Sequence, residues 1–197
     1  MRTETKVYNV YKYEELSEKA KENVRNWYLE TQDSSVFTED CRYRLDELFP
    51  NSNLKVQYSL AYCQGDGLNI YGDIDLNDVL MHIADNFTAK ELKFFNWACR
   101  TYGSMYNMPS NHHYCYCICS RNPFTDDWLC DMEQDCIRAI PEALLGKFSK
   151  LVGNYLDNLC HELEEDGYSY FYEIADEDLR DACEANEWEF DEDGNIW

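Results

Sequence analysis

The feature that most constrains the fold is a regular alternation of side chains over residues 54–63. Larger apolar and aromatic residues occupy every second position, with polar or small ones between them: Leu54, Val56, Tyr58, Leu60 and Tyr62. Because successive side chains of a strand point to opposite faces, this period of two predicts a half-buried β-strand. The glycines of Gln64-Gly65-Asp66-Gly67 can adopt positive φ, so we predict a turn there and an antiparallel return over 68–73.

Apolar stripes with helical spacing predict helices in the rest of the chain. They are expected over 17–30, 35–49, 75–87, 88–103, 126–139, 141–165 and from 176 onward. Capping residues support four of them: Ser17, Asp75, Asp176, and Thr88 together with Glu91. Further short strands are predicted over 6–13, 112–120 and 168–172, a loop over 104–111, and a terminal hairpin turning at Asp193-Gly194. The predicted fold class is therefore α+β, a small antiparallel β-sheet with several helices packed mainly on one face.

The acidic side chains are concentrated in one part of the chain. Among 197 residues there are 39 Asp and Glu against 17 Lys and Arg, a formal net charge of −22. Residues 157–193 hold 16 acidic residues against Arg180 alone, a net charge of −15. Aromatic residues make up 15% of the chain, whereas a disordered acidic tail is poor in them. We expect a globular α+β body over 1–156 and an acidic helix and hairpin segment over 157–197, continuous with it in one domain.

The acidic segment permits two interpretations. A surface this negative repels phosphate, which disfavours direct binding of DNA or RNA. The acids either keep the chain in solution and cap helices, or they form a docking surface for a basic partner. In the second case carboxylates at i, i+3 and i+4, about 5–6 Å apart, imitate a nucleic-acid strand, and tyrosines serve as anchors. The residues predicted to bind the partner are Asp157, Glu162, Glu164, Glu165, Asp166, Tyr168, Tyr170, Glu173, Asp176, Glu177, Asp178, Asp181 and Glu184.

The segment His112–Cys119 carries histidines and cysteines in a pattern that suggests zinc. In a strand, however, same-face neighbours such as Cys115 and Cys117 lie about 6.6–6.8 Å apart. Ligands of one tetrahedral zinc, each about 2.3 Å from the metal, must lie closer together than that. Structural packing of this segment is one interpretation. A zinc site completed by ligands from elsewhere, such as Cys130, Cys136 or His161, is the other.

Catalytic motifs are missing from the sequence. There is no nucleophile elbow, P-loop, dinucleotide-binding glycine motif or zinc-protease motif. Asp66 is interpreted either as a plain turn residue or as an exposed functional carboxylate at the tip of the hairpin. We accordingly predict no catalytic residue, no metal and no cofactor.

The cysteines and the apolar runs bear on the compartment. No stretch has the length and apolar character of a signal peptide or a membrane span. We therefore expect a protein that binds no membrane and stays where it is made. In such a compartment its ten cysteines are expected to be reduced thiols, mostly packed as small hydrophobic residues.

Three segments together resemble proteins of a known kind. They are Tyr13–Asn23, Tyr58–Gly67 and Trp188–Ile196, roughly a sixth of the chain. Each is similar to segments of small, acidic, mostly uncharacterised proteins encoded by phages and prophages of Gram-positive bacteria. Such proteins include anti-CRISPR and other anti-defence inhibitors, several of which are acidic mimics of nucleic acid.

The resemblance implies a non-enzymatic, phage-encoded inhibitor in the cytoplasm of the bacterial host. Its partner would be a basic host protein, such as a CRISPR effector nuclease or its RNA complex, and its acidic surface would block DNA or RNA binding. The alternative is a small phage enzyme or a zinc-dependent accessory protein that uses the His112–Cys119 segment.

Overall fold

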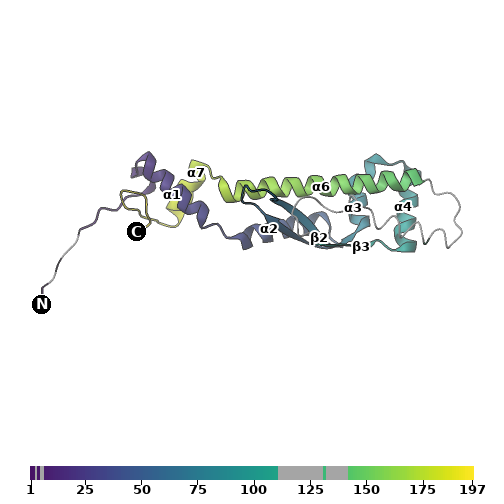
Figure 1. The fold of residues 1–197 in the computed structure, drawn as a ribbon, viewed down its shortest axis with the longest axis horizontal. Helices are drawn as coiled ribbons and strands as arrows, with labels where there is room; N and C mark the ends of the chain where they lie inside the picture. Colours follow the sequence, from purple (N-terminus) through teal and green to yellow (C-terminus); the bar gives the residue numbers. More distant parts are fainter. Residues whose placement is uncertain (3, 5–6, 111–130, 132–141) are drawn as a thin grey trace. The chain divides into compact units, whose positions relative to one another are not determined.

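A computed structural model describes residues 1–2, 4, 7–110, 131 and 142–197 (Figure 1). The chain forms two compact units. Unit 1 consists of Met1–Ser34 and Gly167–Trp197, and unit 2 consists of Ser35–Asp166. The long helix α6, Glu142–Tyr172, has residues in both units, and the division within it falls after Asp166. The predicted acidic segment begins earlier on the same helix, at Asp157.

The sheet of unit 2 contains three antiparallel strands in the order β1-β2-β3. Strand β1 is Asn53–Ser59, β2 is Gly67–Asp75 and β3 is Met105–Met108. The predicted hairpin is confirmed, with Val56 opposite Ile70. Strand β1 ends four residues earlier than predicted because residues 60–66 form the turn, and the predicted loop over 104–111 contains β3.

One face of this sheet is apolar. In the observed register Leu54, Leu68, Ile70 and Ile74 lie on the same side, and each is at most 3% exposed. Tyr58 on this face meets Phe37 edge to face, with ring centroids 5.1 Å apart. The sheet therefore packs its apolar side against helices, as the α+β prediction requires.

The helices that follow in unit 2 each begin within one residue of the predicted start. They are α2 (Ser34–Leu48), α3 (Leu76–Ile83) with the 3₁₀ turn η2 (Ala84–Asn86), and α4 (Ala89–Tyr102). Asp75 Oδ1 accepts a hydrogen bond from Asn77 N at 2.9 Å and so caps α3. Thr88 and Glu91 form the predicted capping box of α4. These side chains satisfy amide groups that a helix leaves without partners at its start.

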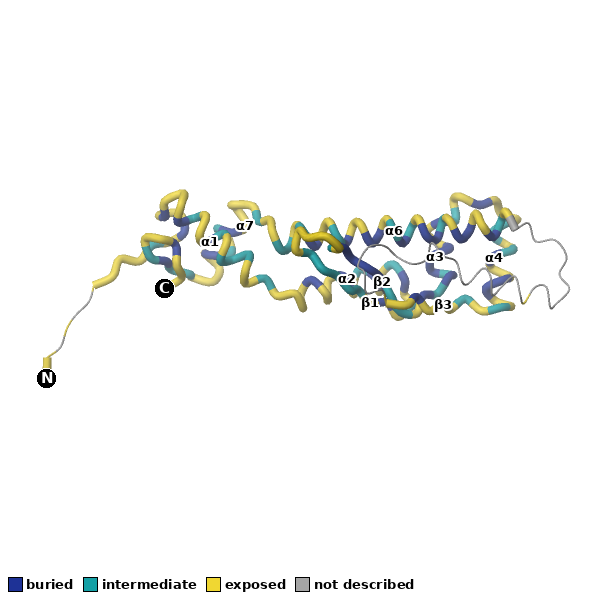
Figure 2. The backbone as a smooth tube through the Cα atoms, viewed as in Figure 1, coloured by how far each residue is buried: buried dark blue, intermediate teal, exposed yellow. Residues whose placement is uncertain are grey.

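Helix α6 provides the centre of the unit 2 core. Phe148 on α6 stacks on Phe95 of α4 with centroids 4.4 Å apart, and Tyr155 stacks on His82 of α3 at 5.1 Å. Figure 2 shows buried residues repeating along α6. Aromatic pairs of this kind contribute about 0.5–1.5 kcal/mol beyond the burial of their area.

Two predictions about the end of α6 are wrong. The helix does not end at Gly167, and Tyr168–Tyr172 is not a strand but its last turns. A glycine inside a helix costs about 1 kcal/mol, and tertiary packing can offset that. Gly167 is buried, and the Tyr170 hydroxyl donates to Asp33 O at 3.1 Å within unit 1. Packing thus overrides both the glycine stop signal and the strand preference of the tyrosines.

Unit 1 is built from the two ends of the chain. Its elements are the 3₁₀ turn η1 (Tyr13–Glu15), α1 (Glu18–Glu30) and α7 (Asp176–Ala185). Ser17 caps α1 as predicted, accepting a bond from Ala20 N at 3.2 Å. The core residues come from all three elements and from the C-terminal segment: Tyr13, Leu16, Ala20, Val24, Leu179, Cys183 and Phe190.

The predicted first strand is reduced to a single bridge, while the terminal hairpin is present. Phe190 pairs antiparallel with Tyr11 on one side and with Ile196 on the other, and Gly194, at φ +84°, lies in the turn. A Cβ added to Gly194 would come within 2.3 Å of Ala20 O, so α1 and this turn require glycine there. The predicted strand over 112–120 and helix over 126–139 lie outside the described residues. In the described part, no helix has the length and apolarity to cross a bilayer.

Candidate partner-binding site

The predicted partner-binding residues fall into two groups. Asp157, Glu162, Glu164, Glu165 and Asp166 belong to unit 2, and the other eight, from Tyr168 to Glu184, belong to unit 1. The formal net charge is −11 in each unit, from 18 acids and 7 bases in unit 1 and from 21 acids and 10 bases in unit 2. Unit 1 has 65 residues and unit 2 has 132, so the negative charge is about twice as dense in unit 1.

On α6, two of the predicted contact residues are held by an arginine from α2. Arg44 Nη1 lies 2.7 Å from Asp166 Oδ2, and Arg44 Nη2 is bonded to Glu162 Oε2. Glu162 and Asp166 are four residues apart on the helix, so without Arg44 they would repel each other. The guanidinium therefore joins α2 to α6 and occupies both carboxylates.

The other acids of α6 differ in how accessible they are. Glu164 lies 3.6 Å from the imidazole of His161, and Asp157 is half-buried. Glu165 is exposed, and its carboxylate has no hydrogen bond or ion pair among the described residues. Three of the four acidic residues between 162 and 166 thus interact with side chains of the fold itself.

The two predicted tyrosine anchors are also partly used by the fold. Tyr168 and Tyr170 are each half-buried. The ring of Tyr168 lies 6.1 Å from that of Tyr172, and Tyr170 meets Phe171 edge to face at 4.9 Å. Part of each tyrosine therefore remains at the surface.

Helix α7 presents its acids to solvent. Leu179 and Cys183 mark its buried side, whereas its five carboxylates are exposed: Asp176, Glu177, Asp178, Asp181 and Glu184. Asp176 is the first residue of the helix and not its cap, because Ala175 occupies the capping position and offers no side-chain oxygen. Asp176 instead pairs with Arg25 of α1.

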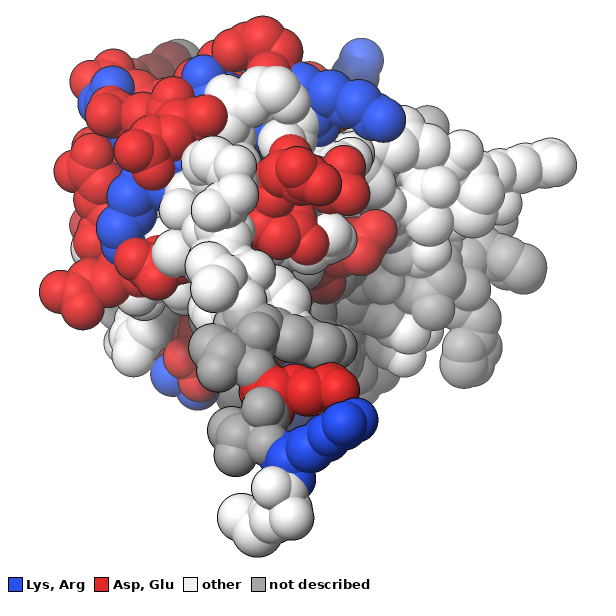
Figure 3. Space-filling view, turned by 90° about the vertical axis from the view of Figure 1, so that its left-hand side faces the viewer, with Lys and Arg blue, Asp and Glu red and all other residues white. Residues whose placement is uncertain are grey.

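The remaining carboxylates of α7 divide into paired and unpaired ones. Arg180 Nη2 lies 3.5 Å from Glu177 and 3.2 Å from Asp181. The side chains of Asp178 and Glu184 take part in no hydrogen bond or ion pair with any described residue. In Figure 3 acidic side chains gather on one part of the visible face, with Lys and Arg side chains among them.

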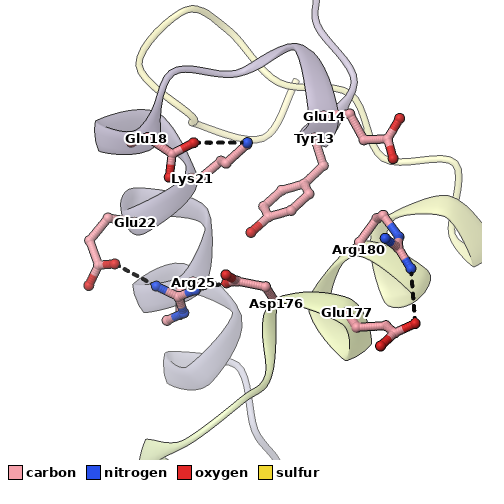
Figure 4. Close-up of a pocket in the computed structure, with 9 residues that line it drawn as sticks. All are labelled: Tyr13, Glu14, Glu18, Lys21, Glu22, Arg25, Asp176, Glu177 and Arg180. Atoms are coloured by element: carbon pink, nitrogen blue, oxygen red, sulfur yellow. Dashed lines mark hydrogen bonds and ion pairs between the residues drawn. The ribbon is translucent and has the colours of Figure 1, made fainter.

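A charged groove of about 640 Å³ lies between η1, α1 and α7 (Figure 4). Its walls combine five carboxylates and three cations around one tyrosine: Tyr13, Glu14, Glu18, Lys21, Glu22, Arg25, Asp176, Glu177 and Arg180. Lys21 Nζ lies 3.1 Å from Glu18, and Arg25 lies 2.6 Å from Glu22. The predicted site residues Asp176 and Glu177 thus line a cavity together with residues from the other end of the chain.

A smaller hollow of about 270 Å³ shares Tyr13, Glu14 and Arg180 with the groove. It adds Glu184 and Glu187 beside the half-buried ring of Trp188. Glu14, Glu184 and Glu187 make no side-chain hydrogen bond or ion pair within the described part of the chain. Three unengaged carboxylates therefore surround a hollow with an aromatic wall.

The alternatives based on metal or catalysis gain no support from the described residues. No group of three or more His, Cys, Asp or Glu there is arranged to hold a metal ion, and His112–Cys119 lies outside the described residues. Four of the cysteines described carry free thiols: Cys41, Cys63, Cys99 and Cys183. Burial raises the pKa of the Cys41 and Cys99 thiols to about 12, so these two stay protonated at neutral pH.

Asp66 has a structural role in the hairpin turn. Its carboxylate accepts bonds from Cys63 N at 2.8 Å, Ala61 N at 2.6 Å and Ser59 Oγ at 3.0 Å. These bonds, led by that from Cys63 N, hold the pKa of Asp66 well below its usual range. This arrangement favours the interpretation of Asp66 as a plain turn residue, because its carboxylate is used for hydrogen bonds within the loop.

Several residues of this site escape prediction from the sequence. Tyr13, Glu14 and Glu187 stand outside the predicted set, and Arg25 and Arg44 were not predicted as partners of the acids. Arg44 and Asp166 are 122 positions apart, so no local pattern joins them. Glu187 could have been included in the predicted set, because it follows the last predicted helix closely and belongs to the same acidic segment.

Comparison of the chain with protein-family models, with curated proteins and with solved structures finds no match in any of the three. The resemblance of three segments to phage-encoded proteins therefore stays a prediction. Two of those segments lie next to each other in unit 1, where Asn23 Nδ2 donates to Asp193 O at 2.9 Å.

Proposed function

We propose that the protein is a non-enzymatic, phage-encoded inhibitor acting in the cytoplasm of a bacterial host. It binds the basic nucleic-acid groove of a host defence protein, a CRISPR effector, and prevents DNA or RNA from entering. The observation that supports this most strongly is the set of unengaged carboxylates on and beside α7, namely Asp178, Glu184 and Glu187.

The distinction between engaged and unengaged carboxylates decides which acids contribute to binding. A carboxylate such as Asp166, already paired with Arg44, gives up an internal interaction when it meets a partner's cation. Asp178 and Glu184 have no such interaction to lose. Charge complementarity of this kind mainly speeds association and selects the partner, and salt screens it.

The geometry of α7 is compatible with mimicry of nucleic acid. Asp178, Asp181 and Glu184 follow one another at intervals of three residues along the helix, so neighbouring carboxylates lie about 5–6 Å apart. A single strand of DNA carries one negative charge about every 3.4 Å along the axis, a density of the same order. A groove that attracts phosphates would attract this row as well.

A binding competition with purified CRISPR effector complexes from Gram-positive bacteria tests the proposal. The full chain is mixed with each effector and its guide RNA, and binding of the labelled target is followed by gel shift as salt increases. At least one effector should lose target binding at low salt and recover it at moderate salt, whereas polyglutamate of equal total charge should have little effect. If every effector in the panel retains its target, the proposal is wrong.

A further inference from the structure

Helix α4 carries cations that the acids of the fold do not neutralise. Of the 14 Lys and Arg residues that the structure describes, seven pair with a described carboxylate, and three of the other seven lie on α4. These three are Lys90, Lys93 and Arg100, whose side chains form no hydrogen bond or ion pair with any described residue. Glu91, the acid of α4, is used by the capping box and by Lys147. The helix is therefore positive in a chain whose net charge is −22.

The three cations share one side of α4 with an exposed tryptophan. We name the four residues the α4 stripe: Lys90, Lys93, Trp97 and Arg100. They follow one another at steps of three or four residues, so they lie together along the helix surface. All four are exposed, Trp97 by 40%. Trp and Arg are among the residues that dominate binding energy at interfaces, so the α4 stripe has the composition of a binding surface for an anionic partner.

Helix α7 carries a complementary set of acids, which we name the α7 row: Asp178, Asp181 and Glu184. The carboxylates of the first and the last have no hydrogen bond or ion pair with any described residue. The row spans six residue steps, about 9 Å along the helix axis, and Lys93 is seven steps from Arg100, about 10.5 Å. Ala185 is exposed beside the row and leaves space for an indole ring. The two surfaces therefore match in the sign of their charges and in their spacing along the axis.

A second copy of the chain fits the α4 stripe better than nucleic acid does. Cations with an aromatic ring are also found where proteins bind single-stranded nucleic acid. A nucleic acid, however, would bring further phosphates against the acids of the same chain, and three cations oppose that repulsion. A second copy brings a row of acids of matching length. Its own net charge is screened beyond about 8 Å at physiological ionic strength, whereas the pairs across the contact are close.

We propose that the α4 stripe of one copy docks on the α7 row of a second copy. The cations form ion pairs with the acids of the row, and Trp97 packs against Ala185. Because the two surfaces differ, the contact is heterologous, and each pair of copies keeps a free stripe and a free row to which further copies can add. The contact goes beyond the proposed function, and it covers the row that would meet an effector, so a docked copy cannot use that row for inhibition.

Sedimentation equilibrium of the full chain at physiological ionic strength tests this inference. The average mass of the wild type should rise with concentration. Two variants reverse the charges of one surface each: the α4 variant carries Lys93→Glu and Arg100→Glu, and the α7 variant carries Asp178→Lys and Glu184→Lys. Each should weaken association about tenfold or more, because two attractive pairs become repulsive. The α7 variant is less acidic than the wild type, so an effect of net charge alone would strengthen its association instead.

An equimolar mixture of the two variants is the sharper measurement. The α7 variant keeps an intact α4 stripe and the α4 variant keeps an intact α7 row, so the mixture should associate although neither variant does so alone. The matched control combines Lys19→Glu with Lys55→Glu, two exposed lysines outside both surfaces. It has the same net charge as the α4 variant and should associate as the wild type does. The fold of each variant is checked by its thermal unfolding midpoint, and the wild-type measurement depends on no variant.

Three results would overturn the inference. The first is a wild-type mass that stays that of one copy at every concentration, and the second is wild-type association by either variant alone. The third is a mixture that associates no more than its components. If the wild type stays a single copy but binds a single-stranded oligonucleotide, and the α4 variant does not, the stripe is a nucleic-acid surface and the inference is wrong. Inhibition of an effector does not require self-association, so the proposed function can stand or fail separately.

Discussion

The two units carry the same formal net charge, −11, but use their carboxylates in different ways. In unit 2 acidic side chains hold backbone and side-chain donors: Asp66 organises the hairpin turn, Asp75 caps α3, and Asp78 is buried among donors. In unit 1, which has half the length, Asp191 organises the terminal turn in a similar way, but many other carboxylates remain at the surface. Those without a side-chain hydrogen bond or ion pair to a described residue include Glu14, Asp178, Glu184, Glu187 and Glu192.

The difference shows that net charge by itself is a poor guide to a binding surface. Glu162 and Asp166 lie in the same acidic run as Asp178 and Glu184, and composition treats them alike. Arg44 neutralises the first pair within unit 2, while nothing described neutralises the second. We therefore expect substitutions in the first group to change stability and substitutions in the second to change association.

The largest effect on stability is expected at Asp78. Its carboxylate is fully buried and accepts bonds from Asn51 N at 2.9 Å, Asn51 Nδ2 at 2.8 Å and Ser52 Oγ at 3.0 Å. Asp78→Ala leaves three donors without their acceptor and should lower the free energy of unfolding by about 3 kcal/mol. Urea unfolding followed by circular dichroism measures the loss.

Asp85→Ala is the matched control, since Asp85 is an exposed acid seven positions farther along. It should change stability by less than about 0.5 kcal/mol. Equal effects at the two positions would remove the basis for calling the acids of unit 2 structural.

A smaller effect is expected from Arg44→Met, which keeps most of the alkyl stem and removes both ion pairs. The carboxylates concerned are 58% and 60% exposed, so the loss should be about 1 kcal/mol. Adding Glu162→Gln and Asp166→Asn to Arg44→Met should restore most of it, because the unpaired like charges are then absent. Arg100→Met, an exposed arginine on α4, serves as the control. A triple variant no more stable than Arg44→Met would argue against the proposed repulsion.

The smallest effect concerns the dependence of stability on pH. The pKa of Asp66 is lower in the folded chain than in the unfolded one, chiefly because Cys63 N donates to its carboxylate. Its contribution to stability is therefore present above the unfolded pKa and is lost as the pH falls below about 4. Asp66→Asn should be less stable than wild type at pH 7, and the difference should shrink in acid. A difference that is the same at both pH values would contradict this account.

Local features of the fold could be predicted from the sequence, and long-range ones could not. The hairpin, the Ser17 and Asp75 caps and the Thr88–Glu91 capping box follow from short patterns whose physics lies within a few residues. The course of α6 through Gly167 depends on packing with elements distant in sequence. Local preference alone therefore gave the wrong end for that helix.

The same division applies to the candidate site. The acidic character of α7 is evident in the sequence, and its five carboxylates are exposed. Which of these carboxylates lack an ion pair depends on where Arg25 and Arg180 lie in the fold, because Arg25 pairs with Asp176 and Arg180 pairs with Glu177 and Asp181. The groove forms where Tyr13 and Glu14 meet α7, more than 160 positions later in the chain. Only the folded chain brings these residues together.

The most direct test of the central claim compares two neutralised variants in the effector competition. Asp178→Asn with Glu184→Gln removes two unengaged charges from α7, and Glu162→Gln with Asp166→Asn removes two engaged charges from α6. The first variant should inhibit target binding about tenfold less strongly than wild type, in line with two exposed ion pairs lost to the partner. The second should inhibit as wild type does once folding is confirmed. If the α6 variant loses inhibition and the α7 variant keeps it, the account is contradicted.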